Sequence, residues 1–342
     1  APGAEVVDAA GRDVYPGLVL GLCAVGAIAF SEMGQWDMDE TSRALVPQMD
    51  IQWAFDLREL KNQRFARAGI TSYGLSPGTQ ALLAGQAALV HTSAERTEDA
   101  FLARRIALKG NYTAAVKRTF KAKEGPQTRM AMYQLLDEAF RSAQEYSEKE
   151  KKDYDEGKEV LCRVLRREIP LIMTANTALE AESVVKLGRR YGLRLVIAGA
   201  FGVEDFAQEI MDQGWHVMLG DGTNMMAAQE NHTDLRRLLE LSRKGLDLSI
   251  YSSGDEGYAY GYEQIWWNAA QMSAAGAAGW EIMDMMTIRP ARALGVDALA
   301  GSLEPGKQAD IILCRGCPAE RFDNYIDQTI VAGRTVFKRE AD

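Results

Sequence analysis

The chain has 342 residues, and 47% of them are hydrophobic, so it can bury one large core with a small appendage. Charged residues make up 25% of the chain, and the formal net charge is -9. An acidic chain offers no broad basic surface to neutralise a phosphate backbone, so we expect no nucleic-acid partner.

The longest apolar stretch runs from Leu18 to Phe30 and is interrupted by Gly21 and Gly26. It is shorter than the roughly 20 residues that cross a bilayer, which predicts a buried strand and no membrane span. We see no cationic leader before this stretch, so we expect a cytoplasmic protein.

Short β-rich runs alternate with amphipathic helical stretches, the pattern of a parallel sheet built from β-α units. The expected barrel strands are Leu18–Val25, Gly69–Ser76, Ala87–Thr92, Pro170–Ala175, Leu193–Ala198, His216–Leu219 and Leu246–Tyr251. Between the third and fourth of these, residues 125–168 predict helices with one apolar face. The charge-dense centre of that insertion, Tyr146 to Glu159, predicts a solvated segment.

The C-terminal part predicts a last barrel helix followed by a small β appendage. Asp284–Leu294 has a helical pattern, and Pro290 is expected to kink or restart that helix. After a turn-rich loop, the expected strands are Ala309–Leu313, Asp327–Val331 and Arg334–Phe337.

The chain has four cysteines, too few for a disulfide framework in a protein of this length. Cys314 and Cys317 form the only tight pair. Such a pair can be half of a zinc site or a redox couple, but no second pair accompanies it. We therefore interpret both as incidental thiols at the end of a strand.

The segment Gly301–Leu313 closely resembles the C-terminal signature of the amidohydrolase superfamily, especially its imidazolonepropionase-like branch. Thr287–Gly295 resembles the helix before that signature, although Arg289 stands where an Asn is more usual. Asp8–Leu18 resembles the family's entry into the first barrel strand. The resemblance implies an α/β fold with a (β/α)8 TIM-type barrel and an active site at the C-terminal ends of the strands.

In this family a small β-sandwich is built from the segments that flank the barrel. The resemblance therefore implies a residual sandwich segment at 1–15, a barrel at 16–297 and a C-terminal sandwich segment at 298–342. Only seven residues precede Asp8, so we expect a truncated sandwich. The exposed edges of such a sheet would invite pairing with a partner.

Members of this family hydrolyse cyclic amides and related C–N bonds with divalent metals that are held mainly by histidines. This chain has three histidines, His91, His216 and His232, and none stands at a ligand position that the resemblance implies. Where a His-x-His pair is expected after the first strand, the sequence has Leu22 and Ala24. Their side chains cannot bind a metal.

Three later positions show the same loss. A histidine-bearing stretch is replaced by Met173–Thr177, and a His-Gly pair is replaced by Ala198 and Gly199. Where an aspartate is expected after the last strand, the sequence has Ser252 and Ser253. The sequence therefore predicts no metal ligand set and no cofactor, with zinc or another divalent ion only if unorthodox ligands serve.

His91 follows a predicted barrel strand, where barrel enzymes carry functional side chains. It is either a pocket residue or a hydrogen-bonded histidine beside the core, and with Cys23 it could form a nucleophile–base pair. His216 begins a strand, at the end of a barrel associated with stability. The expected residues of the degenerate pocket are Leu22, Cys23, Ala24, His91, Thr174, Asn176, Gly199, Ser252, Ser253 and Asp255.

Three hypotheses follow. The first is a metal-free homologue that acts as a structural or regulatory subunit, assembled with itself or with an active amidohydrolase relative. The second is an active C–N hydrolase with unorthodox ligands such as His91 and Asp255, or with a site that a neighbouring chain completes. The third is a protein that binds a small molecule in the barrel mouth.

Overall fold

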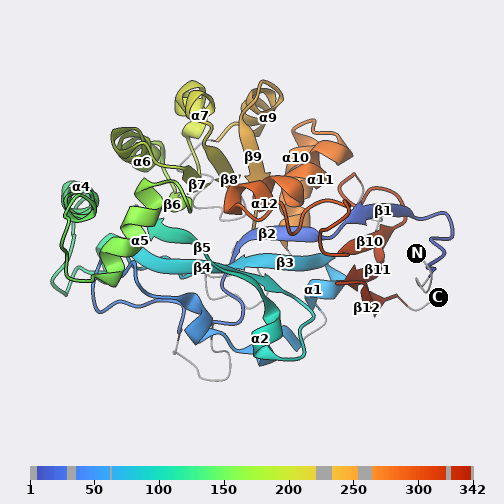
Figure 1. Ribbon diagram of the computed structural model, residues 1–342. Coiled ribbons are helices and arrows are strands. Elements are labelled where there is room, and N and C mark those ends of the chain that lie inside the picture. The colour runs from blue at the N-terminus through green and yellow to red at the C-terminus, as the bar shows by residue number, and fades with distance from the viewer. Residues whose placement is uncertain are drawn as a thin grey trace.

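The computed structural model describes residues 6–28, 36–61, 64–220, 233–252, 264–320 and 325–339. Its centre is a sheet of eight strands that are hydrogen-bonded in chain order (Figure 1). These strands are β2 (Leu18–Cys23), β3 (Ile70–Leu75), β4 (Leu83–His91), β5 (Phe101–Asn111), β6 (Leu171–Ala175), β7 (Leu195–Gly199), β8 (His216–Leu219) and β9 (Asp247–Ile250). The expected eight-stranded barrel architecture is confirmed.

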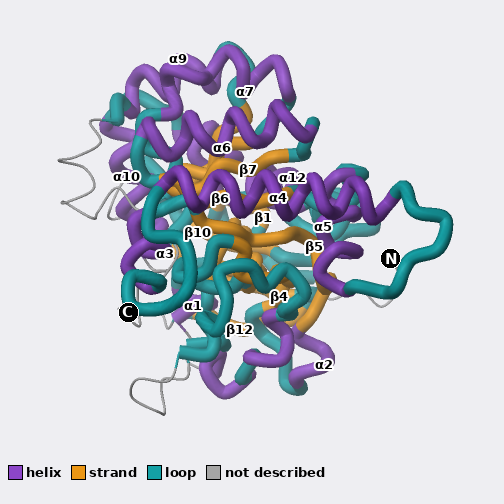
Figure 2. The backbone as a smooth tube through the Cα atoms, turned by 90° about the vertical axis from the view of Figure 1, so that its left-hand side faces the viewer, coloured by secondary structure: helices purple, strands orange, loops and turns teal. Residues whose placement is uncertain are grey.

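The helices lie outside these strands. They are α1 (Arg64–Arg67), α2 (Thr97–Ala100), α3 (Ala114–Thr119), α4 (Arg129–Ser147), α5 (Glu156–Leu165), α6 (Ala178–Tyr191), α7 (Ala207–Gln213), α9 (Leu235–Arg243), α10 (Ile265–Ala274), α11 (Gly279–Met286) and α12 (Ile288–Leu294). Short 3-10 helices occupy Ile51–Ala54, Leu57–Lys61 and Val203–Phe206. Figure 2 shows α4, α6, α7 and α9 as an outer layer against the strands. Within the described ranges, none of the helices combines the length and apolar character needed to cross a bilayer.

Helix α6 illustrates how the sequence fixes one β-α unit. Thr177 caps its N-terminus by accepting a hydrogen bond from the backbone N–H of Glu180 at 3.3 Å. One face of the helix, including Val184, Val185 and Leu187, is buried against the sheet. The helix ends at Gly192, whose φ of 61° is the left-handed conformation that favours glycine. Together these features fix where α6 begins and ends, and so they hold the carboxyl end of β6, which precedes it, in place.

The direction of β4 differs from the expectation of a parallel barrel. β4 is antiparallel to both β3 and β5, whereas the other neighbouring pairs, from β2·β3 to β8·β9, are parallel. The links before and after β4, 76–82 and 92–100, are shorter than the dozen or more residues that a parallel crossover needs. Strand β5 was not predicted, although the other seven strands lie where the sequence placed them.

Among the described strands, β2 and β9 do not pair, so hydrogen bonding leaves the barrel open on one side. Helices α11 and α12 contact both of these strands. Ala291 and Leu294 of α12 pack in one cluster with Leu22 of β2 and Met218 of β8. The helix predicted at Asp284–Leu294 is therefore two helices separated at Thr287, and α12 closes the barrel by side-chain packing.

A second, antiparallel sheet lies beside the barrel (Figure 1). Its order is β1 (Asp13–Pro16), β10 (Ile311–Cys314), β11 (Ile326–Val331) and β12 (Arg334–Lys338). β1 comes from the N-terminal part of the chain and the other three strands come from the C-terminal part. The backbone N–H of Gly17 donates to the carbonyl of Asp310 at 2.9 Å, immediately before β2 begins. This contact fixes the small sheet beside the N-terminal ends of β2 and β3.

Candidate functional site

The carboxyl ends of the parallel strands form one rim of the barrel, which is the edge where active sites of this architecture lie. Most of the site residues predicted from sequence are at this rim. They are Leu22, Cys23 and Ala24 at the end of β2, Thr174 and Asn176 at the end of β6, Gly199 at the end of β7, and Ser252 after β9. Ser253, Asp255 and His232 lie outside the described residues.

The rim residues of β2 face different layers. Leu22 belongs to the cluster that fills the barrel interior, together with Ala107, Ile172 and Met218. Cys23 packs in the other large core cluster and is only 1% exposed. Because successive strand residues point to opposite faces, the Cys23 thiol is directed away from the interior that Leu22 lines.

Gly199 and Asn176 are in direct contact at the rim. Gly199 has a φ of 76°, and a side chain there would collide with Oδ1 of Asn176. The following residue, Ala200, has a φ of 61° and donates its backbone N–H to the carbonyl of Ala175 at 2.8 Å. A left-handed non-glycine residue costs roughly 1–2 kcal/mol. The contacts between β6 and β7 hold this strained turn in place.

Glu180 supports the same turn from helix α6. Its Oε2 accepts a hydrogen bond from the backbone N–H of Asn176 at 2.9 Å. Burial raises the pKa of the Glu180 carboxyl, while the hydrogen bond from Asn176 and the charge of Lys117 act in the opposite direction. The first role of this carboxyl is thus to cap the helix and orient Asn176.

A buried lysine at the rim was missed by the sequence analysis. Lys109 of β5 is 2% exposed and donates hydrogen bonds from Nζ to Asn111 Oδ1, to Thr174 Oγ1 at 2.7 Å and to the carbonyl of Gly110 at 3.3 Å. Asn111 in turn donates to the carbonyls of Gly78 and Ala81. This cluster connects β5, β6 and the β3–β4 loop. In the sequence, the only indication of a buried strand around Lys109 is the apolar run Ile106–Leu108, and the two arginines before this run hide the pattern.

His91 corrects one prediction about the pocket. Because β4 runs antiparallel, its carboxyl end lies opposite Ser72, near the start of β3 and far along the strand from the rim. His91 Nε2 lies 3.6 Å from Asp310 Oδ1, and both side chains are more than 90% buried. His91 therefore faces the small sheet, and the structure does not bring it together with Cys23.

His216 lies at the same end of the barrel. Its Nε2 is 2.7 Å from Ser249 Oγ and its Nδ1 is 3.0 Å from Asp247 Oδ2. This serine–histidine–aspartate contact has the composition of a hydrolase triad, but Ser249 is fully buried within β9. Burial alone would raise the pKa of Asp247, whereas the contact with His216 and the nearby Arg289 and Arg292 lower it overall. The cluster connects β8 to β9.

The cysteine pair also lies in the small sheet, away from the rim. Cys314 and Cys317 are both buried, and neither is in a disulfide bond. Burial, followed by the neighbouring Cys317, raises the pKa of Cys314 to about 12, so Cys314 is a thiol at neutral pH. Burial likewise raises the pKa of Cys317. Neither sulfur has the thiolate character of a reactive cysteine.

The rim side chains do not fit the divalent metal that this fold implies. Metal ions of this kind need imidazole, thiolate or carboxylate ligands, usually three or more from the protein. Among the residues that the structure describes, no group of three or more His, Cys, Asp or Glu could hold a metal ion. The rim instead presents Leu22, Ala24, Thr174, Ala198 and Gly199.

Comparison with known proteins agrees with this architecture. Residues 266–336 match the model of the amidohydrolase family. The structure of an amidohydrolase from Thermotoga maritima MSB8 superposes with a TM-score of 0.87 at 22% identity, covering 99% of this chain and 91% of the other. A second amidohydrolase superposes with a TM-score of 0.60 at 17% identity, covering 99% and 90%. A comparison with curated proteins found no match.

A more distant structural likeness is to a prolidase. A prolidase in complex with N-methylphosphonate-L-proline superposes with a TM-score of 0.54 at 14% identity, covering 99% of this chain and 90% of the other. The fold therefore defines this chain as an amidohydrolase-type barrel protein. The fold is that of the solved amidohydrolases, and residues 266–336 also match the amidohydrolase family model.

Proposed function

We propose that this amidohydrolase-fold protein has lost metal-assisted hydrolysis and acts as a structural or regulatory subunit of an assembly with itself or an active relative. The observation that supports this proposal is the composition of the rim. Leu22, Ala24 and Ala198 stand there in place of potential metal ligands, and without such ligands no metal can lower the pKa of an attacking water.

The two described histidines support the same proposal. A zinc ligand must offer a neutral imidazole nitrogen to the metal. His91 is directed toward Asp310, and His216 contacts both Asp247 and Ser249. Both lie at the amino ends of the parallel strands, so neither can serve at the rim without unfolding a buried contact.

The small sheet offers a surface for the proposed assembly. Its two edge strands are β1 and β12. Asp13 and Val14 of β1 are exposed, as are Arg334, Thr335 and Lys338 of β12. Unpaired edge strands present backbone N–H and C=O groups to another chain. A partner that adds a strand at either edge would enlarge the four-stranded sheet. The partner in this proposal is a second copy of the chain or an active relative with intact metal ligands.

The test is metal analysis of the purified chain combined with an assay on cyclic amides such as hydantoin and dihydrouracil. We expect less than about 0.1 zinc per chain, no hydrolysis, and a melting temperature that a chelator leaves within about 1 °C. The variant Asp255→Asn should behave like the parent in all three measurements. Stoichiometric zinc with hydrolysis that Asp255→Asn abolishes would overturn the proposal in favour of an unorthodox hydrolase.

The Lys109 cluster favours a second candidate, a protein that binds a small polar molecule at the rim. Lys109 and Thr174 lie two residues beyond Ala107 and Ile172, on the face of β5 and β6 that lines the barrel interior, and Asn111 lies on the same face of β5. Polar groups that converge in an otherwise apolar interior are typical of ligand sites. Such a protein would bind a ligand with oxygen or carbonyl groups without hydrolysing it.

A thermal-shift screen of small carboxylates and cyclic amides separates this candidate from an inert scaffold. A ligand that raises the melting temperature of the parent should lose its effect in Lys109→Met and weaken in Thr174→Val, which keeps the side-chain shape. Lys121→Met, at an exposed position, is the matched control. A shift that survives in both rim variants would place the ligand elsewhere.

A further inference from the structure

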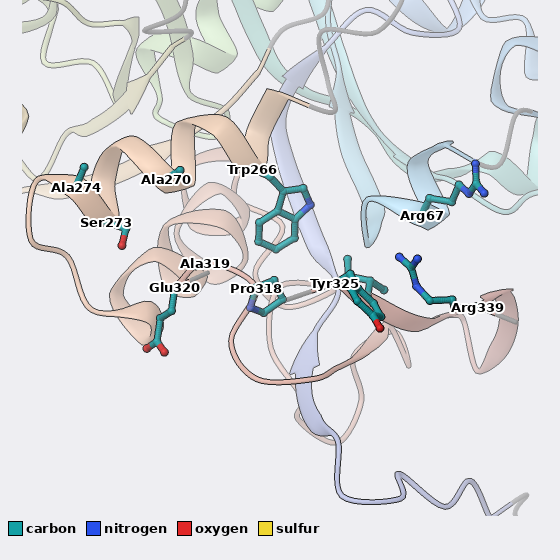
Figure 3. Close-up of a pocket in the computed structure, with 11 residues that line it drawn as sticks. Arg67, Trp266, Ala270, Ser273, Ala274, Pro318, Ala319, Glu320, Tyr325 and Arg339 are labelled. Carbon is teal, nitrogen blue, oxygen red and sulfur yellow. The ribbon is translucent and has the colours of Figure 1, made fainter. Parts of the chain in front are cut away.

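A cavity of about 470 Å³ lies between helix α10 and the small sheet, away from the barrel rim (Figure 3). Its lining comes from parts of the chain that are far apart in sequence. Arg67 ends α1, Trp266 and Ser273 belong to α10, and Tyr325 and Arg339 flank β11 and β12. Its volume is within the range of cavities that enclose small organic ligands.

Two aromatic side chains form the middle of this cavity. The indole Nε1 of Trp266 donates to the carbonyl of Ala68 at 3.0 Å, which fixes the orientation of the ring. The guanidinium of Arg339 lies 4.0 Å from the centre of the Tyr325 ring. Ala270 and Ile326 add apolar surface. The cavity can therefore take a flat apolar group between held side chains.

Two arginines gather at one end of the same cavity. Within the part of the chain that the structure describes, neither Arg67 nor Arg339 has a carboxylate within ion-pair distance. Their guanidinium groups contact aromatic rings, that of Phe337 for Arg67 and that of Tyr325 for Arg339. An arginine that stacks on a ring keeps the N–H groups of its planar edge available as donors. Two such edges suit an oxyanion, which can accept paired hydrogen bonds.

The charged side chains at the two ends of the cavity have opposite signs. Figure 3 shows Glu320 at the end away from Arg67 and Arg339, with Trp266 and Tyr325 between them. The carboxylate of Glu320 would repel a second anion at its end, so an anionic ligand is oriented with its charge toward the arginines. This polarity distinguishes the cavity from a purely apolar groove.

We propose that this cavity is a binding site for a small organic anion with a flat apolar body, such as an aromatic carboxylate. The anionic group lies between Arg67 and Arg339, and the apolar body lies against Trp266 and Tyr325. An aromatic phosphate shares this chemistry and is a second form of the same ligand class. The site is separate from the barrel rim and does not depend on the function proposed for that rim.

The test is calorimetric titration of the full chain with 2-naphthoate, 2-naphthyl phosphate and the neutral 2-naphthalenemethanol. We expect saturable binding of an anion and at least about tenfold weaker binding of the neutral alcohol, because the charge-assisted hydrogen bonds are lost. Added salt should weaken the binding of the anions only. The anion that binds more tightly shows whether the site prefers a carboxylate or a phosphate.

Variants separate this site from non-specific binding. Arg67→Gln combined with Arg339→Gln should weaken naphthoate at least about tenfold. Arg334→Gln is the matched control, because Arg334 is a surface arginine at the start of β12, with a side chain that is 81% exposed and lies outside the cavity. The proposal is overturned if the parent shows no saturable binding at millimolar naphthoate, if the alcohol binds equally well, or if the double variant binds like the control.

Discussion

Gly199 and Ala200 turn the chain at the end of β7 through two consecutive left-handed residues. Gly199 is needed for two physical reasons, its positive φ and the adjacent Asn176 Oδ1. Gly192 shares only the first reason, because its φ is 61° and a side chain there would meet open space. Substitutions at these two glycines therefore distinguish the free-energy cost of backbone strain from that of steric contact.

We expect Gly199→Ala to destabilise the protein by about 2–4 kcal/mol and Gly192→Ala by only about 1 kcal/mol, measured by urea denaturation. The double variant Gly199→Ala with Asn176→Ala should recover the part of the loss that arises from the contact. Equal losses for the two single glycine variants would show that Asn176 adjusts freely and does not constrain the rim.

The composition of the rim was predictable at the level of single residues, but the positions of some residues were not. The absence of histidine from Leu22 and Ala24 follows from the sequence alone. The position of His91 does not, because it depends on the direction of β4. Lys109 was missed because a lysine after two arginines is expected on the surface, whereas only the assembled barrel shows its burial.

Helices α9 and α11 are joined through one buried carboxylate. Glu281 accepts hydrogen bonds from Arg243 Nε at 2.8 Å and Nη2 at 2.7 Å, and its Oε2 accepts the backbone N–H of Ala278 at 2.9 Å. The paired hydrogen bonds from Arg243 lower the pKa of Glu281 below its ordinary value of 4.5, although burial opposes the shift. The same carboxylate thus caps α11 and connects it to α9.

A carboxyl whose pKa is lower in the folded state contributes stability above its unfolded pKa and loses it as pH falls through the folded value. We expect Glu281→Gln to cost about 1–2 kcal/mol at pH 7, with a difference from the parent that shrinks below about pH 4.5. Urea denaturation at several pH values measures this. Glu145→Gln, on an exposed face of α4, is the control. A difference that persists unchanged at pH 3 would contradict the assignment.

The elements illustrate what a sequence pattern can and cannot determine. Apolar runs located most of the strands, and His216–Leu219 was predicted at its observed bounds. β5 escaped prediction because Arg104, Arg105 and Lys109 interrupt its apolar residues. The direction of β4 is set by the short links on either side of it. The apolar pattern of a single strand carries no information on its direction.

At the scale of the whole molecule, the resemblance in the C-terminal segment correctly implied an eight-stranded barrel with a small sheet from both ends of the chain. The sequence did not indicate that β2 and β9 remain unpaired and that α12 fills the space between them. Closure of this kind depends on the packing of Ala291 and Leu294 against Leu22. It is a tertiary property that no local pattern encodes.

The pairing of β1 with β10 has a consequence for synthesis. Val14 lies opposite Leu313, so the ribosome completes nearly the whole barrel before the partner of β1 leaves the exit tunnel. Synthesis adds about 5–20 residues per second. Until β10 emerges, the nascent chain carries β1 as an unpaired strand edge. The small sheet is thus the last part of the molecule that can form, and until then its first strand is open to pairing with neighbouring chains.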